Sequence, residues 1–530
     1  MRQIVSYGIL LCSLVCWAFE TQAQLIDRTQ QANIANEGIA KSYTQEIGPL
    51  VPSPGHGSIT TPDSAMFVMN RDPFRAIRRG RQLFQRKFLQ SEGQGPRLDD
   101  GTGDLSGNLD RAAGLTDSCA ACHGRPRGAA GAGGNVPTRP DSRDAPHLFG
   151  VGLKEMLADE MTADLRAIRT QALTEARTLQ QPVTKPLTSK GIAYGSLTAA
   201  PTGTVDTTNV RGINADLRVR PFFAHGGKIS LREFVVGALQ AEMGLQAVDP
   251  DLMVAHNGGR IMTPSGMILD GALDKLEAPP TDDPAADPDG DGVTNEVPTS
   301  VVDYLEFYLL NYFKPATYEQ THETEKGRTL LDELKCTACH IPNLPLTHDR
   351  RVADVDTVFD PSKGGLNGLS ATATPLHSTA NDSSGFPPLQ PPLLGTFMVT
   401  NIFTDFKRHD LGPSFYERNY DGTLQKEFLT TPLWGVGSTS PYGHDGRSIN
   451  LKEVILRHGG EALPSAQSFV RLSERNQERI LAFLNSLVIF PPDDTASTLN
   501  PANPTTPGFP QFGHGSIKLQ VLFNDPTDPE

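Results

Sequence analysis

The sequence predicts a mainly α-helical protein made of two similar units, with loops and short β insertions between the helices. Three observations support this prediction. A cysteine–histidine motif occurs twice, a helical pattern containing a Gly-Arg pair precedes each copy, and a turn rich in His and Gly twice leads into an apolar helix. Repetition of this kind indicates that one supersecondary unit is used two times.

The length and composition fit a globular protein of more than one domain. The chain has 530 residues, of which 38% are hydrophobic and 20% charged, enough to bury a large core. Acidic residues outnumber basic ones by 61 to 47, which gives a net charge of −14. Because so acidic a molecule repels a phosphate backbone, we expect no nucleic-acid partner.

Residues 1–23 have the pattern of an export signal. Arg2 provides a positive start, residues 4–18 form a short apolar run, and residues 21–23 offer a small-residue cleavage site. The apolar run is short for a membrane span, so we expect cleavage rather than an uncleaved anchor helix. The mature protein is therefore predicted to be periplasmic or secreted and not an integral membrane protein.

The four cysteines outside this signal all lie in two Cys-x-x-Cys-His motifs. This motif attaches haem c through two thioether bonds, and its histidine ligates the iron. A redox-active Cys pair would not need the histidine, and a zinc site would need further ligands close by. We therefore expect two covalently bound haem c groups. Their predicted attachment and ligand residues are Cys119, Cys122, His123, Cys336, Cys339 and His340.

Two further repeats surround the motifs. Helical patterns at residues 76–88 and 325–334 precede the cysteines, and residues 225–233 match residues 444–453 with one insertion. An amphipathic helix at residues 473–487 closes the second unit. The predicted organisation is a signal peptide (1–23), an N-terminal extension (24–75), a first cytochrome-c-like haem unit (76–285), an acidic calcium-like linker (286–299), a second cytochrome-c-like haem unit (300–490) and a Pro-rich tail (491–530).

Alignment of the second repeat separates the roles of the two haems. Seven residues after Leu451 comes His458, whereas seven residues after Leu231 comes Ala238. If the two helices face their haems alike, the second haem has His458 as its sixth ligand and the first haem is open opposite its histidine. The alternative for His458 is a helix-terminal residue before two glycines.

Glu242 lies one helical turn after Ala238, on the same side of the predicted helix. A carboxyl group beside an open haem can move a proton between the two oxygens of a bound peroxide. Glu242 is therefore the candidate catalytic residue, and the alternative is an exposed acid on the helix surface.

Several motifs in the second half resemble a known family. Residues 431–434 (Thr-Pro-Leu-Trp) and 441–447 (Pro-Tyr-Gly-His-Asp-Gly-Arg), with the two haem motifs, resemble the bacterial di-haem cytochrome c peroxidases, a superfamily that includes MauG. Residues 409–413 and 458–462 are more similar to its di-haem oxidoreductase branch. The resemblance spans about residues 76–488.

This resemblance implies a periplasmic peroxidase. Hydrogen peroxide would be reduced at the first haem, with electrons passed through the second haem from a small cytochrome or cupredoxin. The resemblance also places His458 at the sixth-ligand position of the electron-transfer haem and Glu242 at the position of the catalytic acid. Two alternatives stay open: a haem-dependent dioxygenase acting on an apolar substrate, similar to the rubber oxygenases, and a plain electron-transfer cytochrome.

The sequence departs from the family at several positions. The position of the inter-haem tryptophan is Ala224, and Trp434 is the single tryptophan outside the signal. Phe222 or Phe223 is the candidate to fill that gap. A distal glutamine is replaced by Phe234, which makes the first haem pocket less polar.

Two further histidines have weaker predictions. No residue between 124 and 144 matches the resting-state histidine ligand that many of these peroxidases carry. His147 is the nearest substitute, and we expect it to pack at the pocket edge. His409 is predicted to be a surface or turn residue.

A run of acidic residues at 287–296 resembles a calcium-binding loop. Carboxylates occupy positions 1, 3 and 5, and glycine follows at position 6, which suits a hard cation. Position 12 is Pro298 instead of glutamate, and Glu296 is the candidate to compensate. The alternative is an acidic linker without an ion. The predicted ligands are Asp287, Asp289, Asp291 and Asn295.

Overall fold

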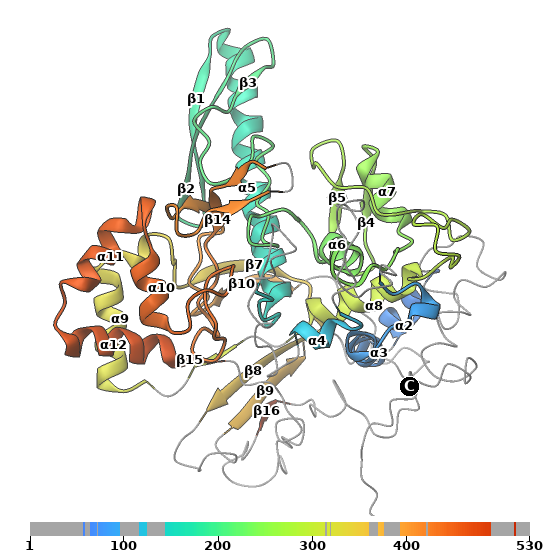
Figure 1. The fold of residues 1–530 in the computed structure, drawn as a ribbon. Helices are drawn as coiled ribbons and strands as arrows, with labels where there is room; N and C mark the ends of the chain where they lie inside the picture. Colours follow the sequence, from blue (N-terminus) through green and yellow to red (C-terminus); the bar gives the residue numbers. More distant parts are fainter. Residues whose placement is uncertain are drawn as a thin grey trace, which may run out of the picture.

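Helices make up most of the regular structure, and the strands are short, in agreement with the predicted mainly α class. The computed structural model (Figure 1) describes residues 57–58, 64–71, 73–95, 116–123, 144–312, 315–317, 320–359, 369–375, 393–419, 422–488 and 513–515. The predicted signal peptide lies outside these residues, as do most of the N-terminal extension and of the C-terminal tail. Among the described helices, none combines the length and the apolar character needed to cross a membrane.

A close helix pair forms the centre of the first unit. Helix α3 (Pro73–Gln85) packs against α8 (Thr299–Leu310), whose residues are all buried. At their contact Gly80 lies against the carbonyl oxygen of Tyr304, where an added Cβ atom would clash. Helix α6 (Leu231–Met243) also contacts α8, and these helices share one large hydrophobic cluster.

The second unit repeats this helix pair. Helix α9 (His322–Glu333) packs against α12 (Glu474–Asn485), and Gly327 lies against the carbonyl oxygen of Arg479. Gly80 and Gly327 are the matching glycines of the two helical patterns that precede the cysteine motifs. The repeat predicted from the sequence is therefore also a repeat of helix packing, because each glycine permits the same close approach.

The predicted boundary between the units is wrong in one respect. Helix α8 was assigned to the second unit, but it packs in the core of the first. The segment before it, rich in Pro and Asp, is not a free linker either: Glu296 and Val297 are buried, and the Val297 carbonyl accepts the N–H of Val248 at 2.9 Å. The first unit thus extends through α8, because this helix supplies the partner that α3 needs to bury its apolar face.

The turn repeat begins two helices with the same capping arrangement. Ser230 caps α6 and Asn450 caps α10 (Leu451–Arg457), and each side chain accepts the N–H of a glutamate three residues on, Glu233 or Glu453. Each glutamate in turn accepts the N–H of the residue before its cap. Helix α10 ends at Arg457, whereas α6 continues for another turn and a half.

A helical arm projects from the body of the protein. Helix α5 (Val151–Leu179) packs against β1 (Val183–Ser189), which pairs with β2 (Ile192–Ala199), and β2 pairs with β3 (Val205–Asp206). These strands form a hairpin that lies along α5 and extends away from the first cysteine motif (Figure 1).

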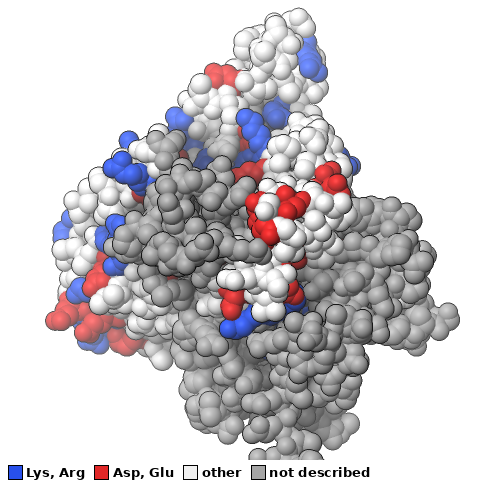
Figure 2. All heavy atoms as spheres, turned by 45° about the vertical axis from the view of Figure 1, so that its right-hand side comes forward, with Lys and Arg blue, Asp and Glu red and all other residues white. Residues whose placement is uncertain are grey.

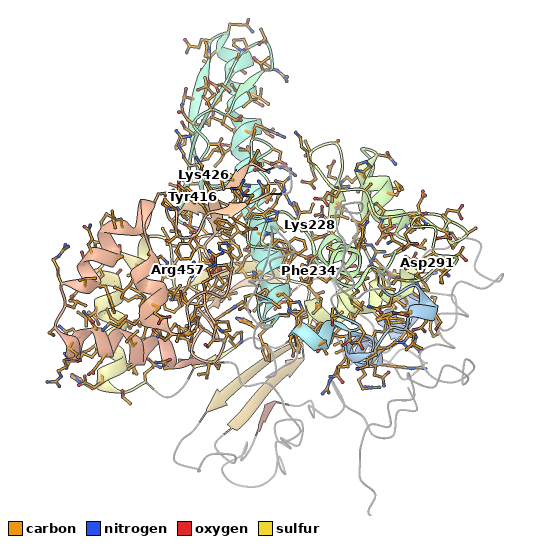
Figure 3. All side chains as sticks on the ribbon, in the orientation of Figure 1. Lys228, Phe234, Asp291, Tyr416, Lys426 and Arg457 are labelled. Atoms are coloured by element: carbon orange, nitrogen blue, oxygen red, sulfur yellow. The ribbon has the colours of Figure 1, made fainter. Side chains whose placement is uncertain are left out.

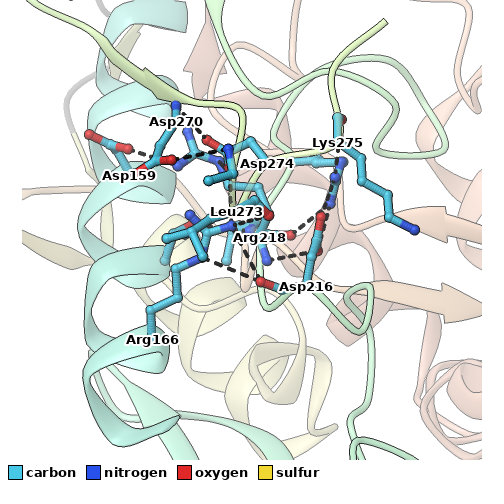
Figure 4. A network of polar contacts seen from close by, with 12 residues as sticks. Asp159, Arg166, Asp216, Arg218, Asp270, Leu273, Asp274 and Lys275 are labelled. Carbon is cyan, nitrogen blue, oxygen red and sulfur yellow. Dashed lines mark hydrogen bonds and ion pairs between the residues drawn. The ribbon is translucent and has the colours of Figure 1, made fainter. Parts of the chain in front are cut away.

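Ion pairs fix the base of this arm to the first unit (Figure 4). The Arg166 guanidinium contacts Asp274 at 2.7 Å, and Arg218 contacts Asp159 of α5 at 3.1 Å. Because Arg218 and Asp274 are almost completely buried, these pairs hold α5 rigidly against the loops that follow the hairpin.

The remaining elements are short. The helices are α2 (Ala65–Arg71), α4 (Cys119–His123), α7 (Pro250–His256) and α11 (Leu463–Val470). The strands are β4 (Arg260–Met262), β5 (Ile268–Asp270), β6 (Ala316–Thr317), β7 (Leu344–Asp349), β8 (Ala353–Phe359), β9 (Leu369–Pro375), β10 (Leu393–Val399), β11 (Arg408–Asp410), β12 (Glu417–Arg418), β13 (Leu424–Gln425), β14 (Glu427–Leu429), β15 (Leu487–Val488) and β16 (Gly513–Gly515).

Most of these strands pair two by two in antiparallel fashion: β4 with β5, β6 with β15, β7 with β10, β8 with β9, β11 with β14 and β12 with β13. Strand β16 is the exception, because it adds to β9 in parallel. It lies in the predicted C-terminal tail, so this part of the tail returns to the body of the protein.

Charges of both signs are spread over the described surface. On the face drawn in Figure 2, Lys and Arg side chains alternate with groups of Asp and Glu. Among the described residues on this face, the basic side chains do not form the continuous stripe that binding to a nucleic-acid backbone uses.

Substitution of Gly327 by alanine should destabilise the second unit. The added methyl group has no space against the Arg479 carbonyl, so α9 and α12 must separate. Overpacking of this kind costs about 1–3 kcal/mol, which urea denaturation of the purified holoprotein can detect. Gly422 is exposed, and an added Cβ there would meet no atom within 4 Å, but its φ of +82° makes it unsuitable as a control. The substitution Ala462→Gly, which lies outside the helix pair, offers a milder comparison. Equal stability of Gly327→Ala and the wild type would contradict the packing described.

Candidate functional site

The first Cys-x-x-Cys-His motif forms the short helix α4. Its His123 donates Nδ1–H to the main-chain carbonyl of Pro146 at 2.7 Å. A carbonyl oxygen can only accept, so this bond fixes the proton on Nδ1 and leaves Nε2 available for a metal. Burial lowers the pKa of His123, which keeps the ring neutral as ligation requires.

The second motif follows α9 and begins with the 3-10 turn η4 (Cys336–Ala338). His340 repeats the arrangement of the first motif, because its Nδ1 donates to the carbonyl of Phe403 at 3.1 Å. Burial, together with the charge of His458, lowers the pKa of His340 to about 4. The imidazole is therefore neutral near pH 7, and its Nε2 is free to ligate iron.

His458 lies at the C-terminal cap of α10 and faces the same space as His340. Its Nδ1 donates to the carbonyl of Val454 at 2.6 Å, and its ring meets Phe415 edge-on at 5.6 Å between centroids. Burial lowers the pKa of His458 as well. The structure thus brings together the two histidines that the sequence predicts as ligands of one iron, each with Nε2 available.

The motif cysteines are half-buried and make no disulfide. Burial raises the pKa of Cys119 to about 12 and that of Cys336 to about 11. At neutral pH these thiols are protonated, in surroundings that suit an uncharged sulfur atom. Such surroundings fit the thioether sulfurs of a covalently attached porphyrin.

Helix α6 presents one side to the first motif. Phe234, Ala238 and Glu242 are spaced by four residues, so they lie on one face of the helix. Ala238 and Glu242 are half-buried, whereas most of the helix is buried. Burial raises the pKa of Cys122, a hydrogen bond from Thr116 opposes the rise, and the charge of Glu242 adds to it. Glu242 therefore lies in the neighbourhood of the motif.

Aromatic side chains cover the start of this face. Phe222 and Phe223 pack against Phe234 with ring centroids 5.4 and 5.5 Å apart (Figure 3 labels Phe234). The two phenylalanines considered as inter-haem residues thus form an apolar wall beside α6. At Ala238 the only side-chain atom on this face is a methyl group, which cannot ligate iron.

His147 and Trp434 meet although 287 residues separate them. His147 follows the residue whose carbonyl accepts the His123 N–H. Its Nε2 donates to the Trp434 carbonyl at 3.0 Å, and the Trp434 ring packs on Gly150. His147 therefore packs against the second half of the chain, and its place at the edge of the haem pocket stays a prediction.

His409 is not a surface residue, because it is only 6% exposed. Its two ring nitrogens contact Asp405 at 2.9 Å and Glu461 at 2.8 Å. Burial disfavours the charged ring, but these carboxylates and a bond to Cys339 outweigh burial and raise the pKa of His409 to about 11. Asp405 is two residues from Phe403 and Glu461 is three from His458, so His409 ties together the supports of both histidine ligands.

The His409 ion pairs predict a pH-dependent stability. The pKa of about 11 in the folded state exceeds the ordinary value of 6.5, so protonation of His409 favours folding. This contribution is complete below about pH 6.5 and is lost as the pH rises toward 11. His409→Gln should remove that part of the slope in urea unfolding and cost about 3–5 kcal/mol near neutral pH, because buried Asp405 loses its partner. An identical slope in both proteins would contradict this role.

Three of the four predicted calcium ligands lie close together. Carboxylate oxygens of Asp287, Asp289 and Asp291 lie within 4.8 Å of one another. Asn295 Oδ1 and Glu296 Oε1 are buried and make no hydrogen bond among the described residues. Burial raises the pKa of Glu296 to about 8, and the charges of the three aspartates add to this rise. The donors are oxygens of the kind that calcium prefers. Figure 3 shows Asp291 at the edge of the first unit, remote from Arg457 of the second.

Comparison with known proteins identifies one family. Residues 368–487 match the family model described as "Di-haem oxidoreductase, putative peroxidase", as the sequence motifs predicted. No curated protein matches the sequence. Thirteen chains of solved structures match. One of them, described as "Crystal structure of a MauG-like protein associated with microbial copper homeostasis", has 13% sequence identity and a TM-score of 0.23, over 55% of this chain and 76% of that chain.

Proposed function

We propose that this chain, whose residues 368–487 match the di-haem oxidoreductase family model, is a periplasmic peroxidase that reduces hydrogen peroxide. It would carry two covalently bound haem c groups. One observation carries the proposal: three predicted ligand histidines each donate Nδ1–H to a main-chain carbonyl and keep Nε2 free. The charge of His458 acts on the His340 ring, which supports placing these two histidines at one site.

Each site has a complete set of haem-binding residues. At the first, Cys119 and Cys122 would form the thioether bonds and His123 would ligate the iron. At the second, the residues are Cys336, Cys339, His340 and His458. The bonds to carbonyl oxygens orient the imidazole rings and increase their basicity, as second-shell partners of metal ligands commonly do.

The difference in ligands between the two sites indicates which of them would react with peroxide. When bound at the first site, the haem would supply an iron atom that binds peroxide and exchanges electrons with it. Ala238 leaves room for the oxidant because its side chain is a single methyl group. Glu242, one turn on, would take the proton from one peroxide oxygen and return it to the other, which leaves as water when the oxygen–oxygen bond breaks. The remaining oxygen would be reduced to a second water by two electrons from the reductant and two protons from solvent. The phenylalanine wall limits the access of bulk water.

The second site is suited to electron transfer. With a histidine on each side, its iron has no open position for an oxidant. A small cytochrome or cupredoxin would supply the electrons. Steady-state oxidation of a reduced small cytochrome should therefore depend on peroxide. Oxygen uptake with an apolar substrate and no reductant would instead indicate a dioxygenase, and absence of both activities a plain electron-transfer cytochrome.

The acidic loop would bind calcium through Asp287, Asp289, Asp291 and Asn295. Glu296 supports this assignment, because a carboxylate that is 8% exposed and has an unpartnered oxygen near three aspartates favours a cation. Its second oxygen accepts the N–H of Gln246 at 2.7 Å, so the ion would also fasten the chain that follows α6.

Addition of calcium to chelator-treated protein should raise its melting temperature. At a calcium concentration about 100 times Kd, binding stabilises the folded state by about 2.7 kcal/mol. Glu296→Gln should weaken this effect, and Asp282→Asn, an exposed acid in the same segment, should not. The site would be excluded if calcium did not change the melting temperature and titration calorimetry detected no calcium binding.

A further inference from the structure

A continuous series of hydrogen bonds and covalent bonds connects the two motif histidines. The first half of this series begins at the first motif. His123 donates to the carbonyl of Pro146 at 2.7 Å. Pro146 is joined by a peptide bond to His147, whose Nε2 donates to the carbonyl of Trp434 at 3.0 Å. Two hydrogen bonds and a short stretch of chain thus lead from the first site to residues of the second half of the sequence.

The second half of the series reaches the other motif. Leu433, the neighbour of Trp434, donates its N–H to the carbonyl of Ile402 at 3.0 Å. The next residue, Phe403, accepts the Nδ1–H of His340 at 3.1 Å. The ligand histidines of the two sites are therefore linked by four hydrogen bonds, joined through covalent bonds.

Most of this series lies in the interior, although Pro146 is exposed. Trp434 is 3% exposed, and Ile402 and Phe403 are fully buried. Trp434 packs in the first hydrophobic cluster, whereas its neighbour Leu433 packs against the second, so the two units meet at residues 433–434. Burial lowers the pKa of His147 to about 4, which keeps the ring neutral and its proton on Nε2.

We propose that His147 and the Trp434 carbonyl carry the electronic coupling between the two haem sites. The proposal rests on the proposed function in requiring a haem at each site. The transfer oxidises one iron from ferrous to ferric and reduces the other from ferric to ferrous, with one electron and no proton moved. No proton is needed because each N–H in the series points to a neutral carbonyl, which is not a base at neutral pH.

This route would replace the inter-haem tryptophan expected from the family, whose position is Ala224 here. Phe222 and Phe223, the nearer substitutes in sequence, pack against Phe234 of α6. His147 instead lies on the His123 side and faces the second unit. Its second ring nitrogen, Nδ1, is buried and has no partner in the described part of the protein. A role limited to hydrogen-bonded packing would leave electron transfer unaffected by its replacement.

The test measures transfer between the haems directly, without peroxide. One electron is introduced into the oxidised full-length holoprotein by pulse radiolysis, and the absorbance of each haem is followed. His147→Phe retains a ring against Phe149 but removes the bond, and inter-haem transfer should slow about tenfold because a hydrogen bond in the low-dielectric interior is replaced by a gap. His147→Gln keeps an N–H donor and should recover most of the rate.

His256→Leu is the matched control, since His256 also bonds a main-chain carbonyl, that of Leu276 at 2.8 Å, but outside the series. Its transfer rate should equal that of the wild type. A wild-type rate in His147→Phe, with both haems attached and both potentials unchanged, would overturn the proposal. If His147→Phe does not fold, His147→Leu provides the same test. Loss of peroxide turnover with normal inter-haem rates would instead count against the proposed function.

Discussion

His458→Ala should convert the second haem from low spin to high spin while both haems stay attached. The variant removes one of two nitrogen ligands and leaves His340, with its bond to Phe403, in place. An iron with a vacant position binds added cyanide or imidazole, so these ligands should shift the spectrum of the variant at this site as well. Visible and EPR spectra of the purified variant measure the change.

His444 provides the control for this variant. It also lies close to Phe415, but its Nε2 contacts Glu417 at 3.1 Å and its ring stacks on Phe428 at 3.9 Å. These contacts give it a partner other than iron, so His444→Ala should keep the low-spin signal. An unchanged low-spin spectrum in His458→Ala would show that another residue ligates this haem.

Glu242→Gln should lower peroxide turnover by about 10²- to 10⁴-fold, the usual contribution of a general acid–base group. Glutamine has nearly the same size but cannot take up and return a proton. The loss should appear in kcat/KM for peroxide, whereas the haem content and the resting spectra should not change.

The matched control is Glu277→Gln, which removes a carboxylate that is 74% exposed and pairs with Lys228. Peroxide turnover should be unaffected by it. If Glu242→Gln retained full activity, the proton transfer would have to be assigned to another group, although the haem sites themselves would stand.

Repeated local patterns were the most predictable part of the fold. Gly80 and Gly327 mark the same helix contact in both units, and Ser230 and Asn450 begin equivalent helices. Such features depend on residues close together in the chain, so their spacing is visible in the sequence. The helix predicted at residues 473–487 is present as α12, and Ser473 occupies its N-cap position, although its side chain makes no capping bond.

The placement of α8 could not be derived in the same way. The acidic, Pro-rich segment before it has the composition of a linker, but composition does not reveal that Glu296 and Val297 are buried. Helix α8 is mostly apolar apart from Asp303 and Glu306, which indicates a buried helix without identifying its partner. The signal that was available is the repeat itself: α3 needed a partner equivalent to the one that α12 provides for α9.

His409 and Trp434 were underestimated for a related reason. Both lie in motifs that resemble the family, but their partners are distant in the sequence. His409 contacts Glu461, 52 residues away, and Trp434 contacts His147, 287 residues away. A charged, buried histidine between two carboxylates depends on the fold to bring them together. The sequence indicated that these positions matter, and the structure supplies the partners that explain why.

The asymmetry between the two sites arises from a small difference in otherwise equivalent helices. Helix α10 ends at Arg457, and His458 follows at its cap, just before Gly459, whose N–H bonds the Leu411 carbonyl at 2.9 Å. In the first unit α6 continues past Ala238 to Glu242. One repeat therefore places His458, the proposed ligand, where the other has Ala238, followed one turn later by Glu242.

The EPR spectrum of the resting ferric holoprotein tests this asymmetry most directly, because it counts the haems in each spin state. We predict one low-spin haem with two nitrogen ligands and one high-spin haem, with added cyanide converting only the high-spin signal. Two low-spin haems that do not respond to cyanide would contradict the account, because neither iron would then be open to peroxide.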